Sequence, residues 1–319
     1  MDLVALAKNP VPSGATTGKF KGAGGINLRF ARWAPTRGPE RGTICLFQGR
    51  GEYIEKYFEV IADLRRRGFS VATMDWRGQG GSDRLLRNRR KGYVRSFTDY
   101  DRDLTQFMKE IVLPTCPAPY IALAHSMGGN ILLRNAGLRG SPFQRMVLTS
   151  PMIAIARQTL GSPPGVVRAY CEVLGALGLG WLYVRSGGNA VLEDTPFENN
   201  PVTSDRERYA RSAMVLEAAP WLGVGSPTVA WLRAALRSIA KINAPDYPRR
   251  VELPLLLFAA GADTIVSIDA IEEFGLRLKV GSHLLIPQAK HELLQEDDKI
   301  RGHFWAVFDE YLGVTATAV

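Results

Sequence analysis

The sequence is poor in cysteine and histidine and has no long apolar run. Its three cysteines, Cys45, Cys116 and Cys171, are an odd number without metal-ligand spacing, which argues against a disulfide framework or a cysteine metal site. The most apolar stretch, residues 173–184, is too short and too rich in glycine to span a bilayer. The N-terminal segment does not look like a secretory signal. We therefore expect a protein of a reducing compartment, the cytoplasm.

The composition is that of a folded protein with a basic surplus. Of 319 residues, 46% are hydrophobic, which is ample for a large core, and 22% are charged, which gives no sign of global disorder. The formal net charge is +9, a balance typical of proteins that meet nucleic acid, an acidic membrane or an anionic substrate. The surplus is scattered apart from one cluster, and no nucleic-acid motif is present. We expect no nucleic-acid partner.

Short apolar runs alternate with amphipathic stretches along most of the chain. Runs this apolar suit the strands of a parallel sheet that is covered on both faces. Helical patterns lie between them, including residues 53–67 and a stretch that begins after Ser96. The alternation predicts a mostly parallel, doubly wound α/β sheet. The expected strands are residues 43–48, 69–76, 120–125, 145–150, 253–260 and 283–287.

The alternation stops between residues 151 and 248. That region has no clear strand, is rich in Pro, Gly, Trp and Leu, and has helical patterns at residues 205–218 and 228–242. We therefore expect an α/β core made of residues 1–150 and 249–319, interrupted by a helical cap or lid of residues 151–248.

The sharpest chemical signal is the segment Ala-His-Ser-Met-Gly-Gly at residues 124–129. It follows an expected strand and precedes an expected helix, as a nucleophile elbow of the G-x-S-x-G type does, with alanine in place of the first glycine. Small residues are needed two positions before and after the serine, because strand and helix pack closely there. The pattern predicts that Ser126 is a nucleophile.

A serine hydroxyl needs a base to activate it, and the chain has only four histidines. His125 adjoins the serine and should face away from it. His283 lies at an expected strand, and His303 lies in the last amphipathic helix. His291 lies in the loop after the last expected strand, where the base belongs, so we predict that it is the base.

The acid that orients the base should follow the penultimate strand, since the order in this kind of site is Ser, Asp or Glu, His. Gly261 allows a turn there, and Asp263 follows it. The competitor, Asp269, should lie in the first turn of the next helix, where it would serve the helix dipole. We predict that Asp263 is the acid.

Acyl transfer also needs two donors for the developing oxyanion. One is expected to be the backbone N–H of Met127, directly after the nucleophile. The other is expected from the glycine-containing loop of residues 47–52, with the N–H of Arg50 as the candidate. Residues 75–82 predict a tight, internally hydrogen-bonded loop beside this site. It lacks the lysine and the spacing of a phosphate loop.

One basic cluster follows directly. It is either a solvated loop or a surface that contacts anionic lipid head groups at the inner face of a membrane. Its members are Arg84, Arg87, Arg89, Arg90 and Lys91.

Five segments in this order resemble one known group of enzymes. They read FQGRGEYIEKY, DWRGQGGSD, AHSMGG, GADTIV and AKHELL. The set is similar to the α/β-hydrolases called lysophospholipases and monoacylglycerol lipases, a branch also labelled serine aminopeptidase-like, and most like the bacterial lysophospholipase L2 type. The resemblance implies an α/β-hydrolase fold with a helical cap, a triad of Ser126, Asp263 and His291, and oxyanion donors at Arg50 and Met127. One departure is Gln48-Gly49, where the lipase branch commonly has His-Gly.

The expected function is hydrolysis of a carboxylic ester with one long acyl chain, without a metal or an organic cofactor. The substrate would be a small lipid or ester. One alternative is a peptidase of the serine aminopeptidase type, with Glu52, Glu55 or Glu193 binding the substrate amine; another is a non-catalytic binding protein. Five apolar residues of the cap either line an acyl tunnel or form the cap's own core. They are Trp181, Leu182, Trp221, Leu222 and Trp231.

Overall fold

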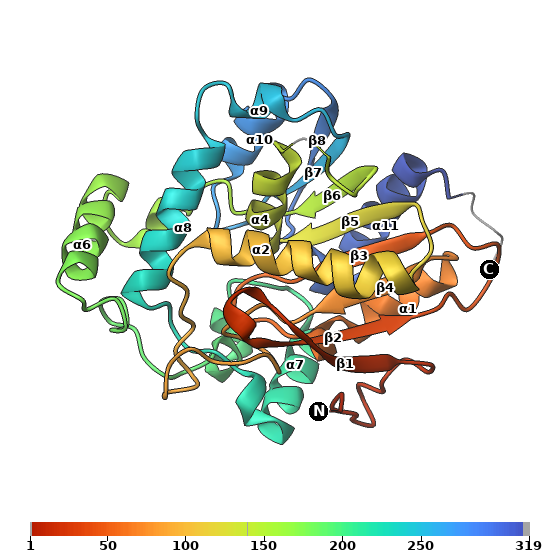
Figure 1. Ribbon diagram of the computed structural model, residues 1–319, viewed down its shortest axis with the longest axis horizontal. Helices are drawn as coiled ribbons and strands as arrows, with labels where there is room; N and C mark the ends of the chain where they lie inside the picture. The colour runs from red at the N-terminus through yellow and green to blue at the C-terminus, as the bar shows by residue number, and fades with distance from the viewer. Residues whose placement is uncertain (1, 139, 315–319) are drawn as a thin grey trace.

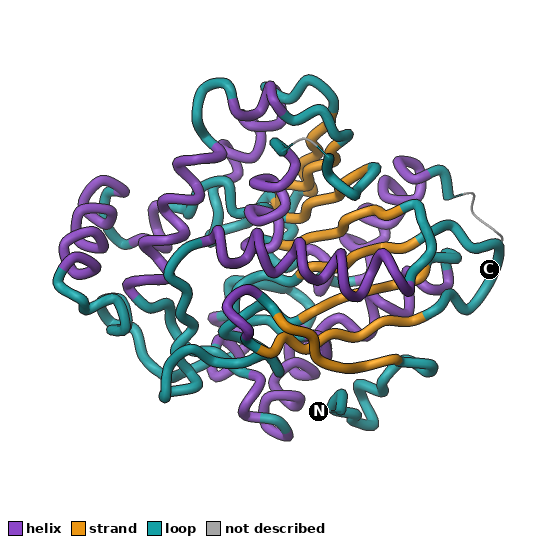
Figure 2. The backbone as a smooth tube through the Cα atoms, viewed as in Figure 1, coloured by secondary structure: helices purple, strands orange, loops and turns teal. Residues whose placement is uncertain are grey.

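The computed structural model describes residues 2–138 and 140–314. Within them, eight strands form one sheet in the order β1-β2-β4-β3-β5-β6-β7-β8. Strands β3 to β8 pair in parallel, whereas β1 pairs antiparallel with β2 and β2 with β4. Figure 2 shows this sheet crossing the molecule between helices. The strands are β1 (Thr16–Lys21), β2 (Asn27–Trp33), β3 (Thr43–Phe47), β4 (Ser70–Met74), β5 (Tyr120–His125), β6 (Arg145–Thr149), β7 (Leu255–Ala260) and β8 (Gly281–Ile286).

Each face of the sheet has its own hydrophobic core, because successive strand residues point to opposite sides. Cys45 and Phe47 of β3 lie in one core, and Ile44 and Leu46 lie in the other. Helices on both faces cover these cores, as the alternating pattern predicts (Figure 1). The first core is covered by α2 (Phe97–Phe107), α4 (Met127–Ala136), α8 (Val229–Ile242) and α10 (Ile268–Leu276), and the second by α1 (Phe58–Arg66) and α11 (Asp298–Leu312).

The six strands predicted from the sequence correspond to β3–β8, and their ends differ from the predictions by at most two residues. The hairpin of β1 and β2 was not predicted. Strand β1 lies at the edge of the sheet and buries only Phe20, so it carries no continuous apolar run. The helix predicted at residues 53–67 begins as a 3-10 turn, η2 (Ile54–Tyr57), and continues as α1.

Between β6 and β7 the chain forms helices and, over residues 150–254, no strand. The helices predicted there are α7 and α8, whose N-caps Asp205 and Thr228 accept backbone N–H groups of the first turn. Figure 1 shows α6 standing away from the sheet. The helical elements of this insertion are α5 (Arg157–Leu160), α6 (Pro164–Ala176), η4 (Leu192–Asp194), η5 (Phe197–Asn199), α7 (Arg206–Ala218), η6 (Pro220–Leu222), α8 and α9 (Tyr247–Arg250).

The remaining elements are short and lie between the larger ones. In the part of the chain that the structure describes, no helix combines the length and the apolarity needed to cross a bilayer. The short elements are η1 (Ala23–Gly25), a π-helical turn η3 (Met108–Val112), α3 (Leu113–Thr115) and η7 (Leu293–Gln295).

Candidate active site

Ser126 occupies a strained turn between β5 and α4. Its backbone has φ 50° and ψ −113°, a conformation that side-chain-bearing residues rarely adopt. Its N–H donates to Thr149 O (3.0 Å) of β6, and its carbonyl accepts the N–H of Met152 (3.0 Å), so the neighbouring chain holds the turn. This is the geometry expected of a nucleophile elbow.

The glycines after Ser126 are required by close packing. A Cβ atom on Gly128 would lie 2.7 Å from Gln48 O, and one on Gly129 would lie 2.8 Å from Pro151 Cβ. Ala124, the residue in place of the first glycine, is fully buried, paired with both β3 and β6. Alanine fits this position, so the departure from G-x-S-x-G leaves the turn intact.

Three side chains that are far apart in the sequence form one hydrogen-bonded chain. Ser126 Oγ lies 3.0 Å from His291 Nε2, and His291 Nδ1 lies 2.7 Å from Asp263 Oδ2. All three are buried, with Ser126 8% exposed. With the proton of the ring on Nδ1, Nε2 accepts a proton from the hydroxyl. The arrangement is one in which a serine can be activated.

Asp263 is held as a carboxylate by its surroundings. Its Oδ1 accepts the N–H groups of Ile265 (2.7 Å) and Val266 (3.1 Å). Burial acts to raise the pKa of Asp263, but the charge and the hydrogen bond of His291, together with these two N–H groups, lower the pKa below its ordinary value. The carboxylate is therefore charged at neutral pH and can orient the imidazole.

The competing residues lie elsewhere. Asp269 is exposed in the first turn of α10, after the N-cap Ser267. His303 is exposed on α11, and His283 lies in β8. His125 is an exception that sequence reasoning missed: its ring packs edge-on against the ring of His291, with centroids 4.7 Å apart. Burial lowers the pKa of His125 to about 4, so it packs there as a neutral ring.

The loop of residues 47–52 (the 47–52 loop) lies against the elbow. A Cβ atom on Gly49 would lie 3.2 Å from Ser126 Cβ. The N–H of Gly49 donates to Glu52 Oε2, and within the described residues the N–H groups of Arg50 and Met127 donate to no other group. Two backbone donors near the serine are thus left for a ligand. The side chain of Gln48 is used in the core, where it donates to Thr73 Oγ1 (2.9 Å).

The loop of residues 75–82 (the 75–82 loop) is internally hydrogen-bonded, as its composition predicts, since Asp75 accepts the N–H of Gly81 and the hydroxyl of Ser82. The loop also braces the 47–52 loop. Gln79 Nε2 donates to Gly49 O (2.7 Å) and to Glu52 O (3.1 Å). Asp75 accepts the N–H of Ile54 (3.0 Å) and forms a buried ion pair with Arg29 (2.6 Å). Sequence reasoning did not single out Gln79 or Arg29, since neither belongs to a pattern with a known catalytic role.

A buried ionic cluster adjoins His291. Lys56 Nζ lies 2.6 Å from Glu292, 3.4 Å from Glu52 and 3.6 Å from Glu193. Burial lowers the pKa of Lys56, but the three carboxylates more than compensate and raise it above its ordinary value. For Glu292, burial, together with the other two carboxylates, outweighs the lysine and raises the pKa to about 7. The cluster joins the 47–52 loop, the loop of His291 and the insertion.

The five basic residues at positions 84–91 do not form a single surface. Arg87 and Arg89 are exposed, whereas Arg84, Arg90 and Lys91 are half-buried. Arg84 donates to the carbonyl oxygens of Ser82 (3.0 Å) and Trp221 (2.9 Å), so it ties this segment to the insertion. Only the exposed pair faces solvent freely.

The five apolar residues considered for an acyl tunnel are divided among different surroundings. Trp181 and Trp221 are 49% and 40% exposed. Leu222 is buried in a small core with Tyr53, and Trp231 is buried in the first core, with Leu182 packed against it. The five residues therefore neither line one tunnel nor form a single core of the cap.

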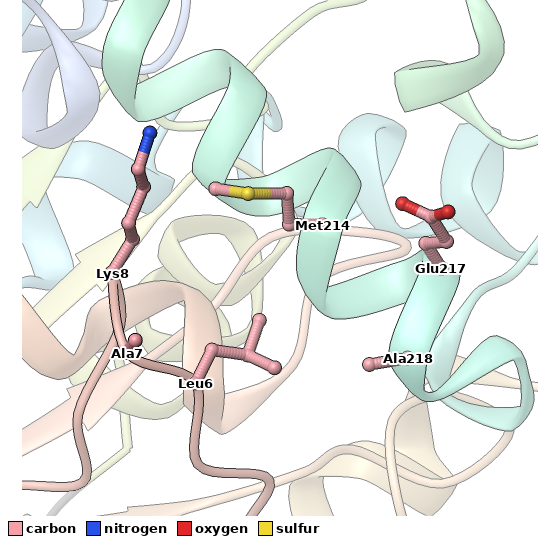
Figure 3. Close-up of a pocket in the computed structure, with 6 residues that line it drawn as sticks. All are labelled: Leu6, Ala7, Lys8, Met214, Glu217 and Ala218. Carbon is pink, nitrogen blue, oxygen red and sulfur yellow. The ribbon is translucent and has the colours of Figure 1, made fainter.

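A surface pocket lies apart from these residues. It has a volume of about 470 Å³, between the N-terminal segment and α7 (Figure 3). None of the predicted site residues lines it. The lining residues are Leu6, Ala7, Lys8, Met214, Glu217 and Ala218.

Comparison with known proteins identifies the family. Residues 38–298 match the family described as serine aminopeptidase, S33. The chain is 31% identical over 294 residues to "Lysophospholipase L2" of Escherichia coli (strain K12), covering 89% of this chain and 83% of that protein. It is 26% identical to "Probable lysophospholipase L2" of Haemophilus influenzae, covering 92% and 91%. Among solved structures, a soluble variant of monoglyceride lipase from Saccharomyces cerevisiae with a substrate analog has the same fold, with a TM-score of 0.74, 19% identity and coverage of 97% and 98%. The chain therefore belongs to the serine aminopeptidase S33 family of α/β-hydrolases, and within that fold it is a serine ester hydrolase.

Proposed function

We propose that the protein hydrolyses esters with one long acyl chain, as a lysophospholipase or monoacylglycerol-type lipase, with Ser126, His291 and Asp263 as its catalytic triad. The proposal rests on the continuous hydrogen-bond chain from Ser126 Oγ through the His291 ring to Asp263. The similarity to proteins named lysophospholipase L2 over most of the chain supports a lipid substrate.

The reaction has two halves that use the same groups. Ser126 Oγ attacks the ester carbonyl while His291 Nε2 takes its proton, and the N–H groups of Arg50 and Met127 bind the oxyanion. His291 then donates the proton to the leaving glycerol oxygen, which leaves an acyl-enzyme. In the second half His291 deprotonates a water molecule, which releases the fatty acid and restores the serine.

Residues 151–248 act as a cap over this site, and residues 1–150 and 249–319 form the catalytic core. The contacts of the insertion support this division. Glu193 lies in the Lys56 cluster, the side chain of Arg50 donates to Gly225 O (2.5 Å), and the N–H of Glu292 donates to Val202 O (2.8 Å). The low exposure of Ser126 agrees with a covered nucleophile.

The test is a panel of lysophospholipids, monoacylglycerols and p-nitrophenyl esters of rising acyl length, run beside Ser126→Ala. We expect kcat/KM to rise from acetyl to long acyl chains, and the variant to fold and lose essentially all turnover. A fluorophosphonate probe should label the wild type and Ser282→Ala, which removes an exposed serine of β8, but not Ser126→Ala. A preference for acetyl esters would contradict the lipid assignment. Failure of the probe to label the folded wild type would favour a non-catalytic binding protein.

A serine aminopeptidase would need a free carboxylate for the substrate amine. The three candidates are all engaged. Glu55 forms a buried ion pair with Arg29 (2.7 Å), and Glu52 and Glu193 lie within 3.6 Å of Lys56. These contacts favour the ester over the peptide. Turnover of aminoacyl p-nitroanilides faster than of lysophospholipid would reverse that preference.

Peripheral contact with an anionic membrane surface is part of the proposal. Helix α6 and the turn after it expose apolar side chains with helical spacing. Lys91 Nζ contacts the ring of Trp181 in that turn, and the exposed Arg87 and Arg89 lie just before Lys91 in the chain. Changing Arg87 and Arg89 to glutamine should weaken sedimentation with phosphatidylglycerol vesicles; unchanged binding would remove these two from the contact. The exposed apolar residues are Val166, Tyr170, Val173, Leu177 and Trp181.

A further inference from the structure

Four cations at the boundary between the core and the insertion lack an acidic partner among the described residues. One of them, Arg84, donates to four carbonyl oxygens, so its guanidinium is fully used and three cations remain. Among the described residues, no carboxylate lies within ion-pair distance of Arg50, Arg90 or Lys91, although each is at least half-buried. Five of the six most deeply buried arginines behave differently, since each has one or more carboxylates within 2.7 Å; the sixth, Arg65, donates to Ala34 O (2.7 Å). Those paired arginines are Arg29, Arg77, Arg134, Arg208 and Arg301.

The guanidinium of Arg50 has N–H groups without an acceptor among the described residues. Its Nη2 donates to Gly225 O, while its Nε is buried and bonded to no group within the described residues. The guanidinium lies 5.1 Å from the centroid of the Trp231 ring. Burial lowers the pKa of Arg50 to about 10, and nearby tyrosines offset this only in part. A desolvated guanidinium with open N–H groups is a strong binder of a planar or tetrahedral oxyanion.

Arg90 and Lys91 lie next to it. The N–H of Gly225 donates to Arg90 O (2.8 Å), so Arg50 and Arg90 bond to the two sides of one residue. Arg90 Nη1 is also buried without a partner in the described chain. Lys91 Nζ lies 5.0 Å from the centroid of the Tyr183 ring, and it follows Arg90 directly in the chain. Arg50 and Arg90 therefore meet at Gly225, with Lys91 beside them.

The position of Arg50 relates this cluster to the ester. Its backbone N–H is the proposed donor to the ester oxyanion, and its side chain runs from there to the insertion. In a lysophospholipid, the short glycerol unit joins the ester to a phosphate. One lysophospholipid molecule could therefore place its phosphate at the Arg50 guanidinium and its ester carbonyl at the Arg50 backbone N–H. It would also supply the negative charge that the three buried cations lack.

We propose that Arg50, Arg90 and Lys91 form an anion subsite that binds the phosphate of a glycerophosphate head group. The subsite selects phosphate-bearing single-chain esters over uncharged monoacylglycerols. The inference rests on the proposed function and goes further, because it names the head-group chemistry that the site recognises.

The first test compares kcat/KM for a lysophospholipid and for a monoacylglycerol with the same acyl chain, both below their critical micelle concentrations. In Arg50→Met and in Arg90→Gln the ratio of the two values should fall about tenfold or more, the loss of one charge-assisted contact. Arg50→Lys should restore part of it. Effects on the backbone N–H of residue 50 act on both substrates and cancel in the ratio. The control is Arg95→Gln, an exposed arginine outside the cluster, which should leave the ratio unchanged.

The second test needs no lysophospholipid turnover. Glycerol 3-phosphate should inhibit hydrolysis of p-nitrophenyl butyrate more strongly than glycerol does, and Arg50→Met and Arg90→Gln should remove that difference. If the wild type hydrolyses neither lysophospholipid nor monoacylglycerol, but glycerol 3-phosphate still inhibits its hydrolysis of p-nitrophenyl butyrate, the proposed function fails and the subsite stands. If lysophospholipid is hydrolysed and the ratio is unchanged in both variants, the subsite is overturned. If Arg50→Met does not fold, Arg90→Gln and Arg50→Lys decide the matter.

Discussion

Replacing Asp263 by asparagine is a sharp test of the proposed triad, because two backbone N–H groups fix the orientation of the new amide. Oδ1 accepts the N–H groups of Ile265 (2.7 Å) and Val266 (3.1 Å), and Oδ2 lies 2.7 Å from His291 Nδ1. The asparagine keeps its carbonyl toward the two donors, so its NH₂ group faces Nδ1. Nδ1 must then accept a hydrogen bond, the ring proton moves to Nε2, and Nε2 can no longer take a proton from Ser126.

A wrong imidazole tautomer of this kind lowers kcat about 10⁴-fold in serine hydrolases, which corresponds to about 5.5 kcal/mol of lost transition-state stabilisation. We expect Asp263→Asn to lose that much kcat/KM toward p-nitrophenyl butyrate while its thermal unfolding stays close to wild type. The matched control is Asp269→Asn, which changes an exposed aspartate of α10 and should keep full activity. The reasoning is refuted if Asp263→Asn keeps more than about a tenth of the wild-type value, or if the two variants lose activity equally.

Three further changes test the packing and the charges around the site. Gly128→Ala places a Cβ 2.7 Å from a carbonyl oxygen of the 47–52 loop and should lower kcat/KM about tenfold or more, because it moves an oxyanion donor. The control is Gly302→Ala in α11, where a Cβ would meet nothing within 4 Å; this variant should raise the unfolding free energy by about 0.5–1 kcal/mol. Arg29→Met leaves two buried carboxylates unpaired and should cost about 3–5 kcal/mol in urea unfolding, whereas Arg66→Met breaks an exposed pair and should cost less than about 1 kcal/mol. Burial raises the folded-state pKa of Glu292 from 4.5 to about 7, so between these pH values the folded protein binds more protons than the unfolded chain. The contribution of Glu292 to stability is therefore present at acid pH and is lost as the pH rises through 7. Glu292→Gln should flatten this fall of the unfolding free energy in urea, and an unchanged pH dependence would contradict the assignment.

Strands β3 to β7 of the central sheet were predictable because they are buried on both faces over almost their whole length. Such strands read as nearly continuous apolar runs. The hairpin of β1 and β2 was missed because polar and charged residues interrupt its apolar residues. Strand β1 buries only Phe20, and Arg29 and Arg32 lie between the apolar residues of β2. An uninterrupted apolar run, rather than burial itself, separates the strands that were found from those that were missed, since β8 is mostly exposed and β2 is mostly buried.

The residues of the candidate site also fall into two groups, those that the sequence identified and those that it did not. Ser126, Asp263 and His291 were identified because each lies in a loop at the carboxyl end of a strand, and in a parallel sheet those ends meet at one edge. The groups that brace them could not be found in this way. Gln79 acts through hydrogen bonds to backbone carbonyls, and Arg29 acts through ion pairs to partners 26 and 46 residues away. Neither kind of contact leaves a spacing in the sequence.

The direction in which each charged side chain of the 47–52 loop points is determined by the fold and cannot be read from the sequence. Arg50 and Glu52 are two residues apart and carry opposite charges. The structure sends them in different directions, because Glu52 is held by the N–H of Gly49 and the hydroxyl of Tyr57 (2.8 Å), while the side chain of Arg50 crosses to the insertion. As a result the negative charge of this loop lies toward His291, where it accompanies Lys56, and the positive charge lies toward the insertion without a counter-ion. A local sequence that is nearly neutral thus folds into a loop with two electrically different sides, and in the proposed subsite the anionic head group of an ester would lie on the side of the insertion.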